Sequence, residues 1–445
     1  MKYVIIGGDA AGMSCAMQIY REDPKAQIVA LEKGDIFSYG QCGLPYLIGG
    51  LIDHHDKLIA RSVQTFREKY GIDARPLHEV THIDADEKIV SGIHMKTKRP
   101  FTEAYDQLLI ATGARPITGQ FSDSTLKQVH VLKTIPDALA ILDDLNEKVK
   151  HITIIGGGYI GLEMAENMKV LGKNVHLIQR GSKLGPGFDQ DMATLIKEEA
   201  IAKGIEVVLN ETVQGLIGET KVTAVQTDRQ TIQTDMVIIA IGVTPQTSFL
   251  QNTNIKRLDN GAIVVDEYLQ TSLNDIYAAG DCAATYHRLK KKHDYIPLGT
   301  TANKQGRIAG FNMTGKKRRF QGVTGTSIMK FMDITAGRTG LSAAEAKEEG
   351  LPFSVITIDS TDHAGYYPDA KEMKIKLIYR SDHGTLLGVQ AIGKSGVDKR
   401  IDVAATALYQ GLTVTDLEDL DLSYAPPFNS VWDPLQQATR RVKKG

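Results

Sequence analysis

One design occurs twice in the chain and limits what the chain can fold into. Each copy has an apolar strand, a glycine-rich turn, a helix and a second apolar strand that ends at a polar residue. The first copy spans residues 3–33 and the second spans residues 151–180. Strands that alternate with helices in this way are typical of α/β domains with a parallel sheet. The repeat therefore predicts two domains of one architecture.

The first copy reads YVIIGGDAAGMSCAMQIYREDPKAQIVALEK. Its pattern predicts a buried strand at Tyr3–Ile6, a helix at Ala10–Tyr20 and a second strand at Gln27–Leu31. Gly7 and Gly12 hold the outer positions of a G-x-G-x-x-G turn, but Asp9 replaces the middle glycine. A carboxylate at that position repels a bound pyrophosphate unless it turns away, and its direction is left open.

The second copy carries the complete turn, with Gly156, Gly158 and Gly161 in register. Glycines at these positions let the backbone approach a pyrophosphate, and the helix N-terminus supplies unpaired N–H groups. A polar residue ends the second strand 25 positions after Gly7 in the first copy and 23 positions after Gly156 in the second. This context makes dinucleotide binding a better interpretation than coincidental turn glycines.

The residues at the two strand ends differ in charge. Glu32, followed by Lys33, suits a ribose because a carboxylate accepts both hydroxyl hydrogens. The second copy instead has Gln179 and Arg180, so nothing repels a 2′-phosphate and a cation is present to pair with it. The sequence predicts that NADPH is accepted, with NADH left open as a second donor. The alternative is that Arg180 is only a solvated residue at the end of the strand and does not contact the cofactor.

Two dinucleotide sites in one chain suggest a relay in which one nucleotide donates hydride to another that is held permanently. Three further motifs favour a flavin as the permanent one. YDQLLIATGARP runs into Thr112 and Gly113, and TDMVIIAIGVTPQT repeats that design with Gly242. TSLNDIYAAGDCAAT places Asp281 after a short strand, where a carboxylate can hold ribityl hydroxyls.

These five ordered motifs resemble the pyridine nucleotide–disulfide oxidoreductase family of FAD enzymes over essentially the whole chain. The resemblance implies an α/β fold with two Rossmann-like domains, one for FAD (1–115 and 246–320) and one for NAD(P) (116–245). It also implies a C-terminal α+β dimerisation domain (321–445), for which the pattern predicts a strand at 373–380 and a helix at 397–411. Family members form homodimers in which this domain lends residues to the partner's active site.

A single cysteine, Cys42, stands in the segment SYGQCGLPY. Phe37 occupies the position five residues earlier, where most disulfide reductases of the family have a second cysteine. A thiolate without an internal partner has to use a sulfur or oxygen atom from outside, as a mixed disulfide or a sulfenic acid. The segment resembles the single-cysteine subgroup, whose members reduce coenzyme A disulfide, peroxide or oxygen.

The other two cysteines have a different context. Cys15 lies inside the first helix and Cys282 follows Asp281, so both are better explained as small buried hydrophobes. Cys42 lies on a glycine-rich segment at the start of a helix, where N–H groups lower a thiol pKa. We therefore expect Cys42 to be the redox thiol. The three cysteines have no metal-ligand spacing, and we expect no metal.

The substrate is predicted from residues that match the subgroup. Members that act on peroxide or oxygen have a histidine at the position of Ala10, and its absence favours a thiol leaving group. The resemblance gives Tyr366 and Tyr424 the role of protonating a departing coenzyme A (CoA) thiolate, with Tyr367 as the neighbouring choice. Two rings that only pack an interface are the alternative.

The resemblance also assigns contacts with CoA and flavin. The CoA contacts are Ser14, Gln18, Arg21, Ser38, Gln41, Asn303 and Trp432. Residues 14, 18 and 21 lie one turn apart on one helix face, which supports a shared groove, and a solvated polar face is the alternative. Glu163 is implied to lie near the flavin in an ion pair.

We predict an enzyme that passes hydride from NAD(P)H through FAD to a Cys42–S–S–CoA mixed disulfide and so reduces CoA disulfide. An NAD(P)H oxidase or peroxidase with a Cys42 sulfenic acid is the second hypothesis, and a flavin redox sensor without turnover is the third. The 52 basic and 53 acidic side chains give no field that attracts nucleic acid or a membrane. Without a cleavage signal or membrane span, we expect a cytoplasmic protein.

Overall fold

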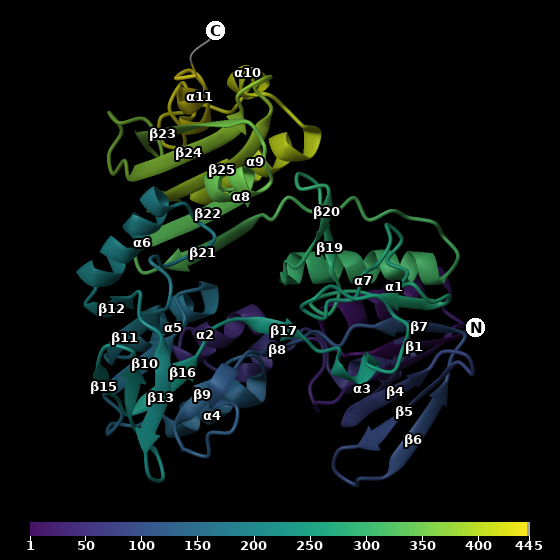
Figure 1. The fold of residues 1–445 in the computed structure, drawn as a ribbon. Coiled ribbons are helices and arrows are strands. Elements are labelled where there is room, and N and C mark those ends of the chain that lie inside the picture. Colours follow the sequence, from purple (N-terminus) through teal and green to yellow (C-terminus); the bar gives the residue numbers. More distant parts are fainter. Residues whose placement is uncertain (443–445) are drawn as a thin grey trace. The chain divides into compact units, whose positions relative to one another are not determined.

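The computed structural model describes residues 1–442, which form two compact units (Figure 1). The first unit comprises Met1–Ile117, Lys133–Ala138 and Val243–Val323. The second comprises Thr118–Leu132, Leu139–Gly242 and the chain from Thr324 onward. The finer division into three domains with the boundaries given above remains a prediction.

A five-stranded parallel sheet forms the centre of the first unit. Its strands, in spatial order, are β18 (Ile276–Ala278), β7 (Gln107–Ile110), β1 (Lys2–Ile6), β2 (Gln27–Leu31) and β3 (Asp73–Arg75). Val4 of β1 lies opposite Val29 on one side and Leu108 on the other. The near-continuous apolar text of these strands is explained by burial on both faces of a parallel sheet.

Helix α1 (Ala10–Glu22) packs against α7 (Gly299–Met313), although nearly 300 residues separate them. Glycines allow the close contact: a Cβ at Gly306 would lie 2.0 Å from the carbonyl oxygen of Ala11, and one at Gly310 would lie 2.8 Å from that of Cys15. The predicted strands and helix of the first copy are confirmed, and α1 continues two residues beyond the expected end.

Smaller elements complete the first unit. An antiparallel sheet contains β4 (His78–Asp84), β5 (Ile89–His94) and β6 (Pro100–Ala104), and two strand pairs contain β8 (Ala114–Pro116) with β17 (Val243–Pro245) and β19 (Thr285–His287) with β20 (Lys292–Asp294). The helices are α2 (Leu44–Ile48) and α3 (Val63–Tyr70), with 3₁₀ turns η1 (Gln41–Gly43), η2 (His55–Leu58) and η4 (Ser248–Leu250). Helix α4 (Ile135–Asp144) begins in the first unit and ends in the second.

The second unit contains the second copy of the repeat. Its parallel sheet has the order β12 (Ile205–Leu209), β11 (Asn174–Gln179), β10 (His151–Ile155), β16 (Met236–Ile239) and β9 (Val129–Val131). Helices α5 (Tyr159–Val170) and α6 (Gln190–Ala202) accompany it, with η3 (Gly119–Phe121) and an antiparallel sheet of β13 (Val213–Gly218), β14 (Val222–Thr227) and β15 (Thr231–Gln233). The two copies thus share one strand–turn–helix–strand arrangement.

The C-terminal part of the second unit is an antiparallel sheet with helices. The sheet order is β21 (Ser327–Phe331), β22 (Ile334–Gly340), β25 (Leu386–Gly393), β24 (Glu372–Arg380) and β23 (Phe353–Thr361). The helices are α8 (Ala343–Glu348), α9 (Val397–Gln410), α10 (Val414–Glu418) and α11 (Pro434–Thr439), of which α9 packs on β22 and β25. The strand and helix predicted here are confirmed within one residue.

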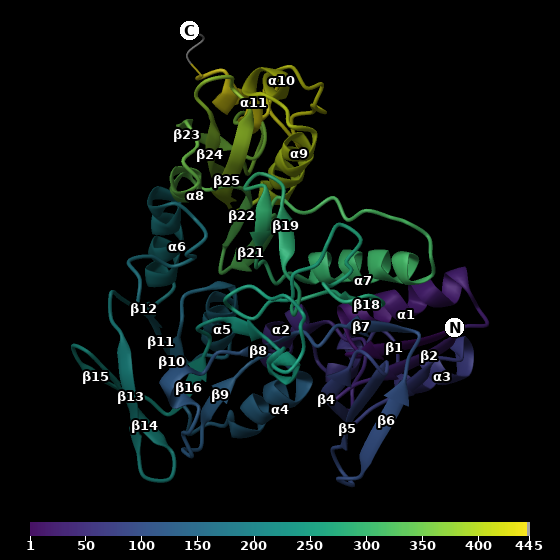
Figure 2. The same ribbon diagram turned by 45° about the vertical axis from the view of Figure 1, so that its right-hand side comes forward.

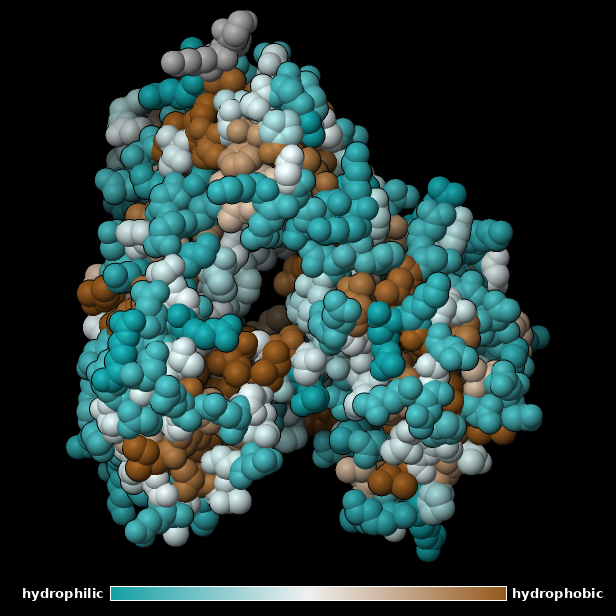
Figure 3. All heavy atoms as spheres, viewed as in Figure 1, coloured by the Kyte–Doolittle hydropathy of each residue, from teal (hydrophilic) through white to brown (hydrophobic). Residues whose placement is uncertain are grey.

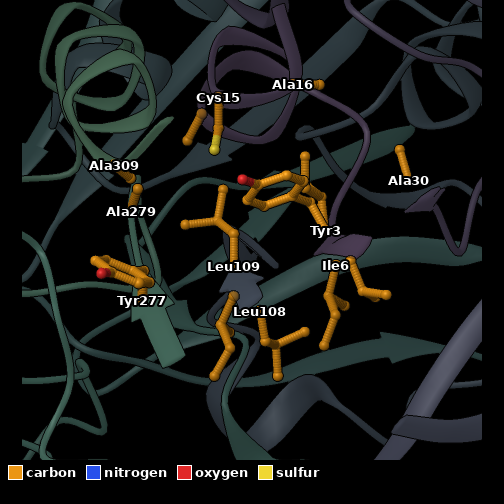
Figure 4. Close-up of a cluster of buried hydrophobic side chains, with 14 of the residues drawn as sticks. Tyr3, Ile6, Cys15, Ala16, Ala30, Leu108, Leu109, Tyr277, Ala279 and Ala309 are labelled. Atoms are coloured by element: carbon orange, nitrogen blue, oxygen red, sulfur yellow. The ribbon is translucent and has the colours of Figure 1, made fainter. Parts of the chain in front are cut away.

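The core of the first unit joins the sheet to α1 and α7. Figure 4 shows Cys15 beside Leu109 and Ala309, among buried side chains of β1 and β7. Cys15 and Cys282 are both fully buried, which confirms that these two cysteines belong to the core.

Hydrophilic residues predominate on the face of the molecule shown in Figure 3, where apolar residues gather in separate groups. Within residues 1–442, no helix has both the length and the apolar composition that a bilayer span requires.

The contact between α1 and α7 can be tested by adding one methyl group. We expect Gly306→Ala to lower the free energy of unfolding by about 1–3 kcal/mol, because the new Cβ meets a backbone oxygen that cannot move aside. Gly299→Ala is the matched control, since a Cβ at Gly299 of the same helix meets nothing within 4 Å. Urea unfolding measures both variants, and equal stabilities would contradict the packing described here.

Candidate functional site

The first glycine turn follows β1 and is too tight for side chains. Gly7 has a φ of +114°, and a Cβ there would lie 2.1 Å from the carbonyl oxygen of Ala111. A Cβ at Gly12 would lie 1.9 Å from the carbonyl oxygen of Gly7. The helix therefore starts close against the strand, and its first N–H groups are at the carboxyl end of the sheet, where a phosphate can approach.

Glu32 lies at the end of β2 and is held by backbone groups. Its carboxylate accepts hydrogen bonds from the backbone N–H of Gly8 (2.7 Å) and of Gly34 (2.8 Å). The remaining lone pairs of a carboxylate can accept ribose hydroxyls. Lys33, also predicted to contact cofactor, instead forms an ion pair with Glu79 (2.7 Å).

Asp9 turns toward the segment that carries the candidate thiol. Its carboxylate accepts a hydrogen bond from the backbone N–H of Tyr39 (3.1 Å) and another from Nε2 of Gln41 (2.6 Å). Burial raises the pKa of Asp9 to about 6, although both hydrogen bonds act in the opposite direction. The structure thus resolves the direction that the sequence left open.

Cys42 lies in η1 and is exposed, and it forms no disulfide. Several backbone contacts hold the segment before it: Ser38 N–H donates to the carbonyl of Gly8 (2.9 Å), and Gly40 N–H donates to that of Leu58 (2.9 Å). Ser38 has a φ of +49°, which is rare for a residue with a side chain and persists where several contacts fix the backbone. The thiol segment is therefore fastened directly to the glycine turn.

The two buried cysteines offer no thiol to Cys42. Burial raises the pKa of Cys282 to about 11, and it raises the pKa of the Cys15 thiol further. Both sulfurs are therefore protonated and unreactive near neutral pH.

Further polar groups of the first unit gather near Asp281, which forms an ion pair with Lys133 (3.0 Å). The hydroxyl of Tyr295 is buried without a hydrogen-bond partner, and burial, followed by the negative charge of Asp281, raises the pKa of Tyr295. Thr112 donates its hydroxyl to the carbonyl of Gln246 (2.7 Å), and Gly113 has a φ of +68°. A buried orphan hydroxyl beside charged groups fits a site for a polar ligand.

The residues predicted on α1 contact one another and α7. Ser14 donates to the side chain of Asn303 (2.8 Å), which the resemblance also assigned to substrate. Gln18 is buried, and its amide oxygen accepts from Arg21 (3.5 Å) and from Arg307 of α7 (3.2 Å). Two guanidinium groups that meet at one oxygen give this edge of the helix pair a positive charge.

The second glycine turn repeats the first. A Cβ at Gly156 (φ +113°) would lie 2.3 Å from the carbonyl oxygen of Ala240, and one at Gly161 would lie 1.8 Å from that of Gly156. Gly158 faces open space, since a Cβ there would meet nothing within 4 Å, and Gly242 after β16 has a φ of +122°. The open side at Gly158 is where a pyrophosphate can approach the backbone.

The end of β11 is also built as in the first copy. The side-chain oxygen of Gln179 accepts from the N–H of Gly157 (3.0 Å), as Glu32 accepts from Gly8. Arg180 is exposed beside it. Lys183, the next cation, donates to the carbonyl of Phe188, so its ammonium group is used to hold the loop closed.

The loop between β11 and α6 (residues 180–189) is hydrogen-bonded at its C-terminal end to β25 of the antiparallel sheet in the same unit. The N–H of Asp189 donates to the side-chain oxygen of Gln390 (3.0 Å), and Nε2 of Gln390 donates back to the carboxylate of Asp189 (3.0 Å). Both residues are buried. The N–H of Gly185 bonds to the carbonyl of Gly157 (2.8 Å), so the loop is also fixed to the turn.

Glu163 on α5 is an unusual carboxyl group. Burial, followed by the charge of Glu166, raises its pKa to about 7. Lys330 pairs with Glu166, because β21 packs on α5 at that point. The predicted ion pair of Glu163 is not formed among residues 1–442, and its place beside the flavin stays a prediction.

The C-terminal residues predicted for substrate lie on exposed segments. The hydroxyls of Tyr366 and Tyr424 are 2.8 Å apart, and this hydrogen bond raises the pKa of Tyr366. Trp432 stacks under Arg440, whose guanidinium carbon is 4.3 Å from the ring centroid. The tyrosine pair joins two segments separated by 58 positions, which supports the choice of Tyr366 over Tyr367.

Sequence reasoning missed Gln390, Lys133 and the role of Asp9. Asp9 was noticed only as a departure from the glycine pattern, and that departure is the signal for its contact with the thiol segment. Gln390 and Lys133 carried no signal, because their partners are distant in the sequence.

This geometry defines a class: an oxidoreductase with two dinucleotide turns and one exposed thiol. The profile described as "Pyridine nucleotide-disulphide oxidoreductase" matches residues 1–306, and the profile of the family's dimerisation domain matches residues 326–435. The chain belongs to the pyridine nucleotide-disulphide oxidoreductase family, as the resemblance predicted. Members of the family use FAD and NAD(P)H, and their dimerisation domain indicates a homodimer.

Individual relatives cover the whole chain. "NAD(P)H coenzyme A polysulfide/persulfide reductase" of Pyrococcus horikoshii is 38% identical over 99% of this chain and 98% of its own length. "Coenzyme A disulfide reductase" of Staphylococcus haemolyticus is 30% identical over 96% of each chain. The crystal structure of reduced Bacillus anthracis CoADR-RHD superposes with a TM-score of 0.96 at 37% identity, and the match covers 99% of this chain and 79% of that one.

The residues of the first unit fit FAD. The turn at Gly7 and Gly12 leaves room for backbone contact with a pyrophosphate, and Glu32 has acceptor capacity left for a ribose. The buried hydroxyl of Tyr295 lacks a partner that a bound polar group would supply. With its carboxylate turned to Tyr39 and Gln41, Asp9 leaves the pyrophosphate position clear of its side chain.

The raised pKa of Asp9 makes a prediction for stability. Its pKa is 3.8 without the fold and about 6 within it, so the folded state binds the proton more tightly. Folding stability should therefore fall as the pH rises from about 4 to about 6, by about 3 kcal/mol from this group. We expect Asp9→Asn to remove that part of the pH dependence in urea unfolding. The exposed Asp35→Asn should keep the wild-type profile, and an unchanged profile in Asp9→Asn would refute the assignment.

Proposed function

We propose that this protein is an NAD(P)H-dependent, FAD-containing reductase of CoA disulfide, working through Cys42 as its one redox thiol. The observation that carries the proposal is the position of Cys42. It is exposed, it lies on a segment bonded to the flavin-type glycine turn, and the two other cysteines are buried. Within this chain Cys42 has no second reactive thiol, so its disulfide partner has to come from the substrate.

The thiol chemistry follows from that arrangement. The Cys42 thiolate attacks one sulfur of CoA disulfide, the S–S bond breaks, and one CoA thiolate leaves while Cys42–S–S–CoA forms. Bound FAD supplies the two-electron redox chemistry that links NAD(P)H to cleavage of this mixed disulfide. The overall balance is NAD(P)H + H⁺ + CoA–S–S–CoA → NAD(P)⁺ + 2 CoA–SH.

The departing thiolate needs a proton, and the tyrosine pair is suited to supply it. A tyrosine phenol is protonated at neutral pH, and the hydrogen bond to Tyr424 raises the pKa of Tyr366 further. A phenol that donates to a leaving thiolate stabilises the charge that develops on it. Since the family is dimeric, we propose that the pair of one subunit serves Cys42 of the other.

The CoA phosphates need cations at the mouth of the site. Arg21 and Arg307 meet at Gln18, beside the contact between Ser14 and Asn303. This edge of α1 and α7 supports the proposed CoA contacts of Ser14, Gln18, Arg21 and Asn303. Gln41 donates its amide to Asp9, which leaves its side-chain oxygen for CoA, and the backbone bond of Ser38 to Gly8 leaves the Ser38 hydroxyl for CoA.

Mass spectrometry of the isolated protein tests the central claim. We expect an adduct of one CoA on Cys42 that a thiol reductant releases. Cys42→Ser should lower NADPH oxidation by CoA disulfide by about 1,000-fold or more, since the nucleophile is lost. Flavin absorbance confirms that the variant is folded, and Cys15→Ala should keep its turnover. An oxygenated Cys42 with rapid peroxide turnover would instead support the oxidase or peroxidase hypothesis and overturn ours.

We further propose NADPH as the preferred donor, because Gln179 is neutral and Arg180 is exposed beside it. Arg180→Ala should raise the KM for NADPH about tenfold and leave that for NADH within about twofold, since only NADPH carries the 2′-phosphate. The exposed Arg229→Ala, in the same unit, is the control. Equal changes in both KM values would rule out this role for Arg180.

A further inference from the structure

Arg400 of α9 is a charged side chain in an unusual place, since only 1% of it is exposed. Its guanidinium donates to four acceptors. These are the carboxylate of Asp433 (3.0 Å), the carbonyl of Asp362 (2.8 Å), the side-chain oxygen of Asn429 (2.9 Å) and the carbonyl of Gly396 (3.1 Å). Asp433 and Asn429 are each 1% exposed, so the whole network is shielded from water.

Two of the acceptors of Arg400 belong to the segments that carry the tyrosine pair. Asp362 begins the segment with Tyr366, and its backbone and side chain bond Lys371 at the other end of that segment (2.9 and 2.8 Å). Asn429 lies in the segment with Tyr424, and its amide donates to the carbonyl of Ser423 (3.1 Å), the neighbour of Tyr424. Figure 2 shows α9 beside β25 of the C-terminal sheet, in which β23 and β24 flank the segment with Tyr366.

The tyrosines themselves have little else to hold them. Tyr366 is 75% exposed and Tyr424 is 45% exposed, so packing within the chain does not fix their rings. One hydrogen bond joins the segments directly near the pair, from the N–H of Ala364 to the carbonyl of Pro426 (3.4 Å). The separation of the two hydroxyls therefore depends on the backbones below, which Arg400 connects.

A buried ion pair is a poor means of adding stability, because removing two charges from water costs about as much as their attraction returns. It is a good means of fixing geometry. The planar fork of a guanidinium reaches several acceptors in set directions, which a lysine ammonium cannot reproduce. The fork of Arg400 reaches one acceptor in each tyrosine segment, Asp362 and Asn429.

We propose that Arg400 is a positioning residue for the Tyr366–Tyr424 pair and thereby for protonation of the leaving thiolate. This inference rests on the proposed function for its catalytic consequence. Its structural content, that Arg400 sets the contact between the two phenols, can be tested without turnover.

A double-mutant cycle on the holoenzyme tests the catalytic consequence. Arg400→Lys keeps the charge but loses the fork, and we expect it to lower kcat for CoA disulfide about tenfold. In a background with Tyr366→Phe and Tyr424→Phe, the same change should cost less than about twofold, because the pair through which it acts is gone. Equal losses in both backgrounds would show a merely structural role and overturn the proposal.

Controls separate positioning from folding. Arg380→Lys changes a partly exposed arginine at the end of β24, whose partner is Asp382, and should leave kcat unaltered. Asn429→Ala keeps the ion pair of Arg400 with Asp433 and removes the side-chain hydrogen bonds of Asn429 to Arg400, Ser423 and Ser430. If Arg400→Lys fails to fold, Asn429→Ala takes its place in the cycle with the same expected pattern.

Oxidative coupling of the two phenols tests the contact without turnover. With persulfate and a photosensitiser, each phenol loses one electron and one proton, and a carbon–carbon bond joins the rings as fluorescent dityrosine. The part of the dityrosine yield that is lost in Tyr366→Phe comes from the Tyr366–Tyr424 pair. We expect Arg400→Lys to reduce this part of the yield severalfold and Arg380→Lys to leave it unchanged. An undiminished yield in Arg400→Lys would overturn the proposal.

Failure of the proposed function is distinguishable from failure of this inference. A wild-type protein inactive toward CoA disulfide would refute the proposed function alone, and the coupling yield would still decide the role of Arg400.

Discussion

The close approach of helix to strand at the two glycine turns is the constraint on which both dinucleotide sites depend. In each turn the last glycine of the motif lies so near the first carbonyl that a Cβ would be within 2 Å of it. This contact brings together the strand end, the helix N-terminus and the hydrogen-bond acceptor at the end of the next strand. Glu32 and Gln179 then make equivalent hydrogen bonds to Gly8 and Gly157, so the duplication extends from the sequence to individual contacts.

Much of the fold was predictable because it depends on local patterns. Apolar runs marked most strands of both parallel sheets, although β3, β9 and β12 were not predicted. The first helix and its flanking strands were predicted almost to the residue. The direction of Asp9 was not predictable, since it is set by Tyr39 and Gln41, about 30 positions away. Gln18 shares a helix face with Arg21 as expected, but α7 covers it, and no local pattern shows which helix will pack there.

The candidate site also contains residues that could be predicted from the sequence and residues that could not. Cys42, Tyr366 and Tyr424 were chosen from short segments whose residue types carry chemistry, and the structure leaves all three exposed. The residues that orient them were not chosen. Arg400 looks in sequence like one more polar residue of an amphipathic helix, and only the fold reveals that Asp433 and Asn429 close over it. Groups that react are recognisable from type, whereas groups that position are recognisable only from contacts.

The reciprocal bond between Asp189 and Gln390 has a consequence for how donor choice can change. The loop after β11 is anchored at two points, through Gly185 to Gly157 and through Asp189 to Gln390. Neither anchor involves the side chain of Arg180. Charge at that position can therefore be exchanged while the loop keeps its path. Replacing Arg180 with a neutral or acidic residue therefore changes the charge at the end of β11 without rebuilding the scaffold that presents it.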